Sequence, residues 1–418
     1  MQKLGVDNGA MTDNWAQSYT YRASSIEQPT TVSAVQELVA RAPHVRGLGT
    51  RHSFTGLADT SGVLVNLAKL EVEPYIDGAT VVVPGGMRYG ELAAWLQERG
   101  FALHNLASLP HISVAGAVAT GTHGSGDSNG TLAAAVASID LVTASGDLVT
   151  LRRGDPDFDG AVVSLGALGV VVSLALDIQP TFDVRQDLYD GLSWHDLLTN
   201  LDDVTGAAYS VSIFTNWQGE SIDMLWTKSR MDAPEPAPTI FGARRQAIER
   251  HMLPDQATVS TTQQGGIPGP WSDRLAHFKL EFTPSNGEEL QSEYLVPRRN
   301  AAEALAAVRE LRDSITPLLL ITEVRTMSAD TLWLSGAYET DAVGIHFTWK
   351  KLPVEVEAVL PSIEAVLLPL GARPHWGKVF TGLATENYPR FDDFLELRSR
   401  FDPTLKFDNE FLRKFLTR

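Results

Sequence analysis

The stretch NLASLPHISVAGAVATGTHGSGDSNG, residues 105–130, is rich in glycine, serine and threonine. Glycine keeps side chains out of the way of a ligand, so backbone N–H groups can converge on an anion. A helix that begins near Ala115 would direct its N-terminal dipole at the same place. Composition alone supports a phosphate-binding cradle and a glycine-rich core turn equally.

A second glycine-rich stretch, RGLGTRHSFTG at residues 46–56, contains Arg51 and His52 among small residues. It overlaps HVRGLG, which predicts a short strand that runs into a glycine turn. From composition alone, His52 is an incidental polar residue of that turn. A chemical role for His52 needs support from other parts of the chain.

Composition and charge exclude several classes of partner. The formal net charge of −17 repels nucleic-acid phosphates and anionic lipid surfaces, so neither is an expected partner. Long uncharged stretches such as residues 161–176 are β-branched and interrupted by glycine and serine, which predicts buried strands and no membrane span. The absence of cysteine removes disulfides, thiolate nucleophiles and cysteine-ligated metals.

The beginning of the chain, MQKLGVDNGAMTDNWAQ, lacks the apolar region of a secretory signal. We therefore expect a cytoplasmic protein. Met11 can equally serve as a start codon, which would make residues 1–11 an extension without a structural role.

The length of 418 residues exceeds the ~250–300 residues over which one hydrophobic core usually grows, so two domains are expected. Up to Pro180 the chain alternates short helices and strands, and beyond it the loops become longer. We place the boundary near residue 182. Helices are expected in residues 30–41 and 89–100, the second ended by Gly100, and hairpins at Asp77-Gly78 and Ser145-Gly146.

Several familiar motifs fail on their own chemistry. DPDFDG at residues 155–160 begins like a calcium loop, but Gly166 occupies the twelfth position, where a bidentate Glu is required. The chain contains no P-loop and no H-E-x-x-H, and His123 stands two residues before Ser125, where the G-x-S-x-G turn of a hydrolase nucleophile requires glycine. No metal site is predicted.

Polar side chains alternate along two apolar stretches of the second half. Glu323 and Arg325 in LLLITEVRTMS, and His346 and Thr348 in GIHFTWK, are two residues apart, so each pair leaves one face of a strand. Such groups are costly to bury unless a ligand hydrogen-bonds them, and a polyol is a suitable ligand. The alternative is a Glu–Arg pair on a solvated sheet face. For Lys378 in RPHWGKVF, the alternative to a site role is an ordinary surface lysine.

The chain resembles the vanillyl-alcohol-oxidase-type flavoproteins in a series of motifs that occur in the same order. These motifs are GLGTRHS, ASLPHISVAG, VATGTHGSG, SLGALGVV, HWGK and DPTLKFDNEFL. Within that family the chain is most similar to the alditol oxidases, which include the xylitol oxidases. The resemblance covers nearly the whole chain from Trp15. It departs at Arg51, where family members often carry glycine; an arginine there could clash with the cofactor or pair with its pyrophosphate.

The resemblance implies a two-domain α+β fold. An FAD-binding domain, residues 1–182, would be followed by a substrate-binding cap domain, residues 183–372, built on an antiparallel sheet with flanking helices. Residues 373–418 would return to the FAD-binding domain. The residues implied to bind FAD are Gly47, Leu48, Gly49, Thr50, Arg51, His52 as a covalent link to the flavin, Ser53, Ser108, Ser113, Val114, Ala115, Gly116, Thr120, Gly121, Thr122, His123, Gly124, Val171 and His375.

The resemblance also implies an activity. A terminal alcohol of an alditol such as xylitol or sorbitol would pass a hydride to flavin N5, and O₂ would reoxidise the flavin to give H₂O₂ and an aldose. Ala107 lies where a small residue admits O₂ to the flavin. The implied roles are proton acceptor for His346 or Lys378, charge stabilisation for Arg325, and hydroxyl binding for Glu323, Thr348 and Ser108.

Two alternatives remain open at this point. An aldonolactone oxidoreductase shares the flavin motifs, and a non-catalytic flavin- or sugar-binding protein would keep the glycine stretches alone. The polar strand pairs and Lys378 favour the alditol branch and an enzyme. We expect a monomer that binds only small molecules: FAD, a polyol and O₂.

Overall fold

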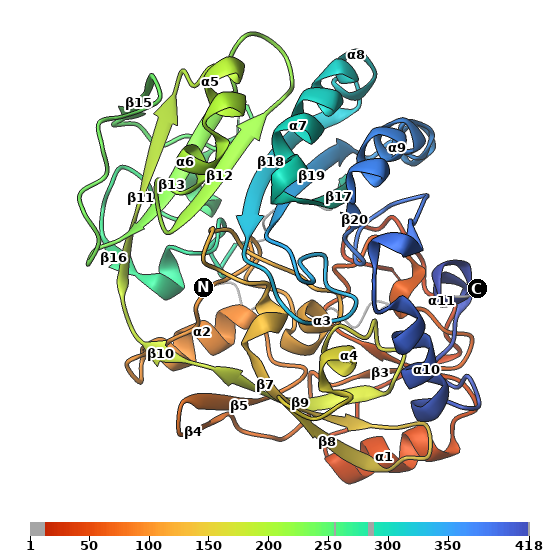
Figure 1. Cartoon of the computed structure of the whole chain (residues 1–418). Coiled ribbons are helices and arrows are strands. Elements are labelled where there is room, and N and C mark those ends of the chain that lie inside the picture. The colour runs from red at the N-terminus through yellow and green to blue at the C-terminus, as the bar shows by residue number, and fades with distance from the viewer. Residues whose placement is uncertain (1–12, 255, 283–287, 417–418) are drawn as a thin grey trace.

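The computed structural model of the chain describes residues 13–254, 256–282 and 288–416 (Figure 1). The predicted extension at residues 1–11 lies outside the described residues. Helices and strands are mixed along the whole chain, as predicted. A smaller sheet lies at one end of the molecule and a large sheet at the other, and the glycine-rich loops lie between them.

The smaller sheet is antiparallel, with the order β4-β5-β9-β7-β8. Gly78 and Gly146, at the two predicted hairpin turns, have φ of 59° and 90°, which glycine adopts without steric cost. Its strands are β4 (Tyr75–Asp77), β5 (Thr80–Pro84), β7 (Val136–Val142), β8 (Leu148–Arg152) and β9 (Val170–Asp177).

Short helices surround this sheet. The helix α1 (Val32–Arg41) packs against β7, and its N-terminus is capped by the hydroxyl of Thr31, which accepts a hydrogen bond from the amide of Ala34. Gly100, with φ of 77°, follows the end of α2, as predicted. The other elements here are α2 (Tyr89–Gln97), α3 (Val114–Ala119), α4 (Phe158–Val162), and the paired strands β6 (Phe101–Ala102) and β10 (Gln179–Pro180).

A three-stranded parallel sheet leads into the glycine-rich loop of residues 49–53. Its order is β1 (Ser25–Glu27), β3 (Val63–Asn66), β2 (Val45–Leu48). The side chain of Asn66 donates to the carbonyls of Leu48, at 3.2 Å, and Gly49, at 3.3 Å. The loop at residues 49–53 therefore starts from a buried strand end whose position is fixed.

The large sheet has ten strands in the described part of the chain, in the order β14-β15-β11-β13-β12-β18-β19-β17-β20, with β16 beside β11. All its pairings are antiparallel. The strands are β11 (Asp183–Asp190), β12 (Ser210–Thr215), β13 (Met224–Arg230), β14 (Thr239–Ile240), β15 (Ala243–Gln246), β16 (Gly269–Pro270), β17 (Glu289–Pro297), β18 (Leu319–Met327), β19 (Ala342–Lys350) and β20 (Arg373–Pro374).

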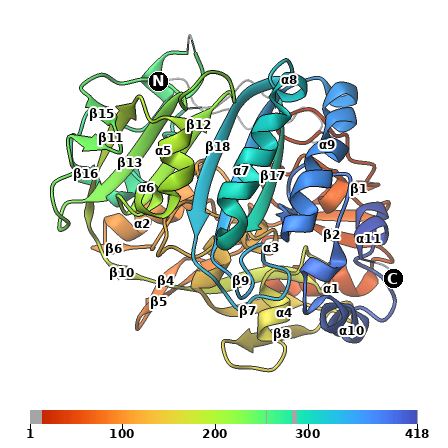
Figure 2. The ribbon, with the colours of Figure 1, turned by 45° about the horizontal axis from the view of Figure 1, so that its top comes forward.

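Helices cover one face of the large sheet (Figure 2). These are α5 (Trp194–Thr199), α6 (Leu201–Thr205), α7 (Ala301–Glu310) and α9 (Pro353–Leu367), with α8 (Arg312–Ile315) after α7. Phe347 and Trp349, on the covered face of β19, are buried in one hydrophobic core with Leu305 of α7 and Leu360 of α9. Because side chains alternate along a strand, Glu323, His346 and their neighbours leave the opposite face.

The C-terminal segment returns to the first part of the chain through α10 (Phe391–Phe401) and α11 (Glu410–Phe415). The buried guanidinium of Arg46 joins these parts, because it donates to the carbonyls of Phe407 at 2.7 Å, Leu57 at 2.6 Å and Leu165 at 2.6 Å. The domain limits at residues 182 and 372 stay predictions.

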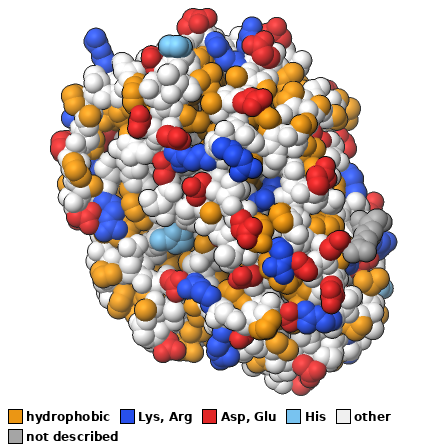
Figure 3. Space-filling model, viewed as in Figure 1, with side chains coloured by type: hydrophobic (Ala, Val, Ile, Leu, Met, Phe, Trp, Pro, Cys, Tyr) orange, Lys and Arg blue, Asp and Glu red, His pale blue; other side chains and the backbone are white. Residues whose placement is uncertain are grey.

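The surface carries charges of both signs. On the face in Figure 3, acidic and basic side chains are interspersed. None of the helices in the described ranges has the length and apolar character that crossing a bilayer requires. Within the same ranges, no group of three or more His, Asp or Glu side chains is placed to hold a metal ion.

Candidate active site

One pocket brings most of the predicted site residues together, although they come from distant parts of the sequence. It extends from the glycine-rich loops to the uncovered face of the large sheet. The predicted residues that line it are Gly47, Leu48, Gly49, Thr50, Arg51, His52, Ser53, Ala107, Ser108, Ser113, Ala115, Gly116, Thr120, Thr122, His123, Val171, Glu323, Arg325, His346, Thr348, His375 and Lys378. The predicted residues Val114, Gly121 and Gly124 are not part of the lining.

His52 lies in the first loop, with its ring stacked on Trp15 at a centroid distance of 5.3 Å. Nδ1 is 3.0 Å from the hydroxyl oxygen of Thr50, which also accepts a hydrogen bond from the amide of Ser113. Within the described residues, Nε2 is buried and has no hydrogen-bond partner. Burial, followed by the charges of His111 and Arg88, lowers the pKa of His52 to about 3, so its ring is neutral at physiological pH.

Arg51, the departure from the family pattern, has φ of 65°. This left-handed conformation is costly for a residue with a Cβ and favours glycine. The guanidinium of Arg51 donates to the carbonyl of Asp13 at 2.9 Å, and the amide of Trp15 donates to the carbonyl of Arg51 at 2.8 Å. Arg51 thus anchors the segment that places Trp15 on His52.

The glycines of the two loops allow a close approach of backbone segments. A Cβ on Gly49 would lie 2.4 Å from the hydroxyl oxygen of Ser113, and one on Gly116 would lie 2.8 Å from the same atom. A Cβ on Gly47, by contrast, would meet no atom of the described residues within 4 Å and would project into the pocket. A flat ligand that follows the backbone of residues 47–53 fits this surface, and the flavin and ribityl part of FAD has that shape.

In the glycine-rich stretch of residues 105–130, several backbone amides donate hydrogen bonds within the protein. The amides of Ser113, Val114 and Ala115 donate to the Thr50 hydroxyl and to the carbonyls of Met87 and Gly85. These three amides are therefore engaged within the protein. Residues 113–116 shape the cradle by packing.

The large sheet forms the opposite wall of the pocket. In the register of the strands, Glu323 of β18 lies beside His346 of β19, which lies beside Glu293 of β17. The adjacent row contains Ile321, Thr348 and Gln291. Glu323, Arg325, His346 and Thr348 are 5 to 8% exposed, so they are buried polar groups and do not form a solvated face.

Glu293 links the cationic side chains of this wall. Its carboxylate lies 2.6 Å from the Lys378 ammonium, 2.9 Å from the Arg325 guanidinium and 3.1 Å from Nε2 of His123. Burial alone would raise the pKa of Glu293, but the charges of Lys378, His123 and Arg325 outweigh burial and hold the pKa well below its usual value. The burial of Lys378 lowers the pKa of its ammonium, a shift that Glu293 opposes.

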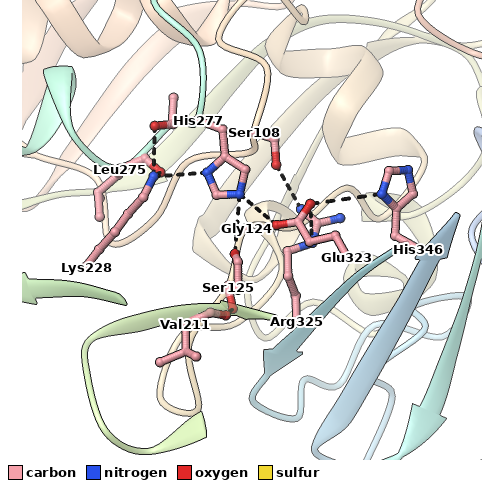
Figure 4. A network of polar contacts seen from close by, with 12 residues as sticks. Ser108, Gly124, Ser125, Val211, Lys228, Leu275, His277, Glu323, Arg325 and His346 are labelled. Carbon is pink, nitrogen blue, oxygen red and sulfur yellow. Dashed lines mark hydrogen bonds and ion pairs between the residues drawn. The ribbon is translucent and has the colours of Figure 1, made fainter. Parts of the chain in front are cut away.

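Glu323 has a different set of partners (Figure 4). Its Oε1 lies 2.7 Å from Nε2 of His277, and its Oε2 lies 3.7 Å from Nε of Arg325 and 4.0 Å from Nδ1 of His346. Burial would raise the pKa of Glu323, but Arg325 and His277 outweigh it and the pKa is lowered. Nη1 of Arg325 donates a hydrogen bond to the hydroxyl oxygen of Ser108 at 3.2 Å.

His346 occupies the middle of this wall. Burial, reinforced by the charge of Lys378, holds its pKa well below the usual value, so the ring is neutral. Within the described residues, neither ring nitrogen has a hydrogen-bond partner. A neutral imidazole with a free nitrogen at the surface of a pocket can accept a proton from a ligand.

Comparisons with known proteins agree with this geometry. Residues 23–152 match a family model described as an FAD binding domain, and residues 283–415 match one described as D-arabinono-1,4-lactone oxidase. An alditol oxidase from Streptomyces sp. (strain IKD472 / FERM P-14339) is 46% identical over 414 residues, which cover 96% of this chain and 98% of that protein. The chain belongs to the alditol oxidase family of FAD-dependent flavoproteins. The prediction of an FAD-dependent oxidoreductase is thereby confirmed.

The alditol oxidase family is itself related to lactone-oxidising flavoproteins. L-gulono-1,4-lactone dehydrogenase from Mycobacterium tuberculosis (strain ATCC 25618 / H37Rv) is 30% identical over 430 residues, covering 96% of this chain and 98% of that protein. The crystal structure of cholesterol oxidase from B. sterolicum superposes with a TM-score of 0.76 at 16% identity, covering 97% of this chain and 96% of that chain. The second likeness concerns the fold alone and confirms the predicted vanillyl-alcohol-oxidase-type architecture.

Three polar residues of this alditol oxidase family member were not identified from the sequence. Glu293 belongs to ELQSEYLVP, where Glu289, Gln291 and Glu293 alternate with the same two-residue period that identified Glu323 and Arg325. That signal was available. His277 and Lys228 reach the site from a loop and from β13, and no periodic pattern connects them with Glu323.

Proposed function

We propose that this flavoprotein oxidises the terminal primary alcohol of alditols, such as xylitol and sorbitol, to the aldose, with O₂ as electron acceptor and H₂O₂ as second product. The observation that carries the proposal is a polar wall that faces the glycine-rich loops across one pocket. It consists of the buried Glu323, Arg325, His346 and Thr348 and the partly buried Lys378. Buried polar groups are costly unless they are paired, and the hydroxyls of a polyol can pair with several of them at once.

The residues that line the pocket suit FAD at its loop side. When bound, FAD supplies a hydride acceptor and transfers two electrons to O₂. The backbone of residues 47–53, together with Ser113, Gly116 and Val171, would hold it, because the glycines leave room along the backbone. Ala107 is buried and lines the same pocket, where its small side chain leaves O₂ a path.

His346 is the proposed acceptor of the substrate hydroxyl proton. Its neutral ring has a free nitrogen, whereas the Lys378 ammonium already donates to Glu293 at 2.6 Å. Arg325 and Lys378 would stabilise the negative charge that develops on the substrate oxygen as the proton leaves. Replacing His346 by Ala should slow anaerobic bleaching of the flavin by xylitol by about 10²–10⁴-fold. Bleaching at the wild-type rate would remove His346 from this role.

The remaining polar residues would orient the substrate. Glu323, Thr348 and Ser108 line the pocket, and Oε2 of Glu323 and the two hydroxyls can bind hydroxyls along the polyol chain. Holding the chain at several points fixes the reacting carbon, and such positioning contributes directly to rate.

A covalent link between FAD and His52 is part of the proposal. A neutral imidazole with an unpartnered nitrogen, held in place by Trp15 and Thr50, would supply the nitrogen of a bond to the 8α-carbon of the flavin. The 8α-methyl group would lose one C–H hydrogen as a proton, and the two electrons left on the flavin would pass to O₂. The linked ring would raise the flavin potential and favour hydride uptake from an unactivated alcohol. A monomeric, cytoplasmic protein stays a prediction from the sequence.

Oxidation of an aldonolactone is the second candidate, favoured by the match of residues 283–415 to the lactone oxidase model. A steady-state comparison of H₂O₂ production from xylitol, sorbitol and a galactono-lactone separates the two. The proposal expects the highest kcat/KM with one of the two alditols. A higher value with the lactone would replace the first candidate by the second.

A further inference from the structure

A buried lysine and a histidine stand behind Glu323, outside the residues assigned above. Lys228 of β13 is 1% exposed, and its ammonium donates to the carbonyls of Leu275 at 2.6 Å and Ala276 at 2.8 Å. Its third contact is Nδ1 of His277 at 3.1 Å, and Nε2 of His277 is 2.7 Å from Oε1 of Glu323. Figure 4 shows the three side chains in line, with His277 between Lys228 and Glu323. His277 and Glu323 line the pocket, and Lys228 does not.

The hydrogen-bond chemistry of this line permits one arrangement of protons. An ammonium has three donors and no acceptor, so Nδ1 of His277 must offer its lone pair to Lys228. The ring proton of neutral His277 is then on Nε2, where it donates to the Glu323 carboxylate. The hydroxyl of Ser212, 3.3 Å from the same Nε2, is a second and longer contact. A doubly protonated His277 would place an N–H against the ammonium.

We propose that Lys228 and His277 are positioning residues that fix the tautomer of His277 and thereby hold Oε1 of Glu323, leaving Oε2 to bind a substrate hydroxyl. This inference rests on the proposed role of Glu323 as a substrate ligand. Lys228 acts on the substrate only through His277 and Glu323, and it lies behind the pocket lining.

The arrangement depends on the charge of Lys228. If Lys228 loses its proton, its lone pair faces Nδ1, which favours the other tautomer and turns a lone pair of Nε2 toward the Glu323 carboxylate. Burial lowers the pKa of Lys228 to about 7; the charge of Glu323 opposes this shift and that of Arg274 adds to it. The neutral Gln186 and Ser210 lie beside Lys228 on the flanking strands β11 and β12. Affinity for the substrate should therefore fall as pH rises through the pKa of Lys228.

A double-mutant cycle on the holoenzyme tests the inference. Lys228→Met should lower kcat/KM for xylitol, measured by steady-state H₂O₂ production, by about tenfold, mostly through weaker substrate binding. In the Glu323→Ala background, Lys228→Met should change kcat/KM by less than about twofold, because the group on which it acts is gone. Lys350→Met is the matched control, since Lys350 is an exposed lysine of β19 that donates to the carbonyl of Pro317 at 2.7 Å.

Two substitutions of His277 provide a test that does not depend on Lys228→Met folding. The amide oxygen of Gln can accept from Lys228 and its NH₂ can donate to Glu323, which reproduces the predicted tautomer. His277→Gln should therefore keep kcat/KM within about threefold of the wild type, while His277→Leu should lose about tenfold. The alkaline fall in substrate affinity should persist in His277→Gln and be absent in Lys228→Met.

Three results would overturn the inference: equal effects of Lys228→Met with and without Glu323, equal activity of His277→Gln and His277→Leu, or an unchanged alkaline fall in Lys228→Met. Failure of the proposed function looks different, because the wild-type flavin would then not be bleached by xylitol at all. If a galactono-lactone bleaches it instead, the same cycle run with the lactone decides the inference.

Discussion

Replacing Glu293 by Gln removes one charge from the wall of the pocket and keeps the side-chain shape. In the wild type, the buried carboxylates of Glu293 and Glu323 face the two cations Arg325 and Lys378. The variant leaves one carboxylate for the buried Arg325 and the partly buried Lys378, and the Lys378 ammonium loses the carboxylate 2.6 Å away. Removing one partner of a buried ion pair costs about 3–5 kcal/mol of folding free energy, because the other charge stays buried.

The expected shift in Tm follows from the length of the chain. For 418 residues the entropy of unfolding is about 0.9 kcal/mol per kelvin, so a loss of about 4 kcal/mol lowers Tm by about 4–5 °C. Thermal unfolding followed by circular dichroism on the FAD-loaded protein at neutral pH measures it. Glu310→Gln is the control, since its carboxylate is 82% exposed and lies 3.9 Å from Arg312. We expect Glu310→Gln to unfold within about 1 °C of the wild type.

The effect also has a sign with respect to pH. A carboxylate with a depressed folded-state pKa stabilises the fold above its unfolded pKa, near 4.5 for Glu293, and that contribution is lost as pH falls through the folded-state value. The Tm difference between the wild type and Glu293→Gln should be complete at neutral pH and shrink below about pH 4.5. An unchanged Tm at neutral pH, or a difference that acid leaves constant, would refute this account of Glu293.

Three further predictions concern the loop side of the pocket. In acid precipitates, flavin fluorescence should stay with the wild-type pellet and move to the supernatant for His52→Ala; equal release from both would refute the covalent link. Arg46→Met leaves the carbonyls of Leu57 and Leu165 without their guanidinium donor and should lower the free energy of unfolding by about 2–4 kcal/mol. An unchanged Tm in thermal unfolding would contradict this. Arg51→Gly relieves the left-handed backbone but loses the bond to Asp13, so chymotrypsin should cut after Trp15 faster than in the wild type; equal cleavage would contradict the anchoring role.

Period-2 polar pairs were the most informative local signal in the sequence. Glu323 and Arg325, and His346 and Thr348, do leave the same faces of β18 and β19, because alternation along a strand is a property of the backbone itself. The hairpins at Gly78 and Gly146 were predictable for a similar reason, since their conformations favour glycine. Local chemistry decides such features, so one sequence suffices to find them.

Strand order limited the rest of the prediction. The pairing of β17 with β19 places Glu293 beside His346, but β17 and β19 are separated by a helix pair and by β18 in the sequence. The contact of His277 with Glu323 depends on a loop without periodicity. Lys228, which contacts His277, lies on β13, and β12 separates β13 from the strand β18 that carries Glu323. These partners are set by long-range packing, which no local pattern encodes.

The central claim is that the loops and the polar wall act together on an alditol. Anaerobic mixing of the FAD-loaded protein with excess xylitol, followed at the flavin absorption band near 450 nm, tests it most directly. The account predicts full bleaching by xylitol, recovery of the oxidised spectrum when O₂ is admitted, and one H₂O₂ per flavin reoxidised. A spectrum that xylitol and sorbitol both leave unchanged would contradict it.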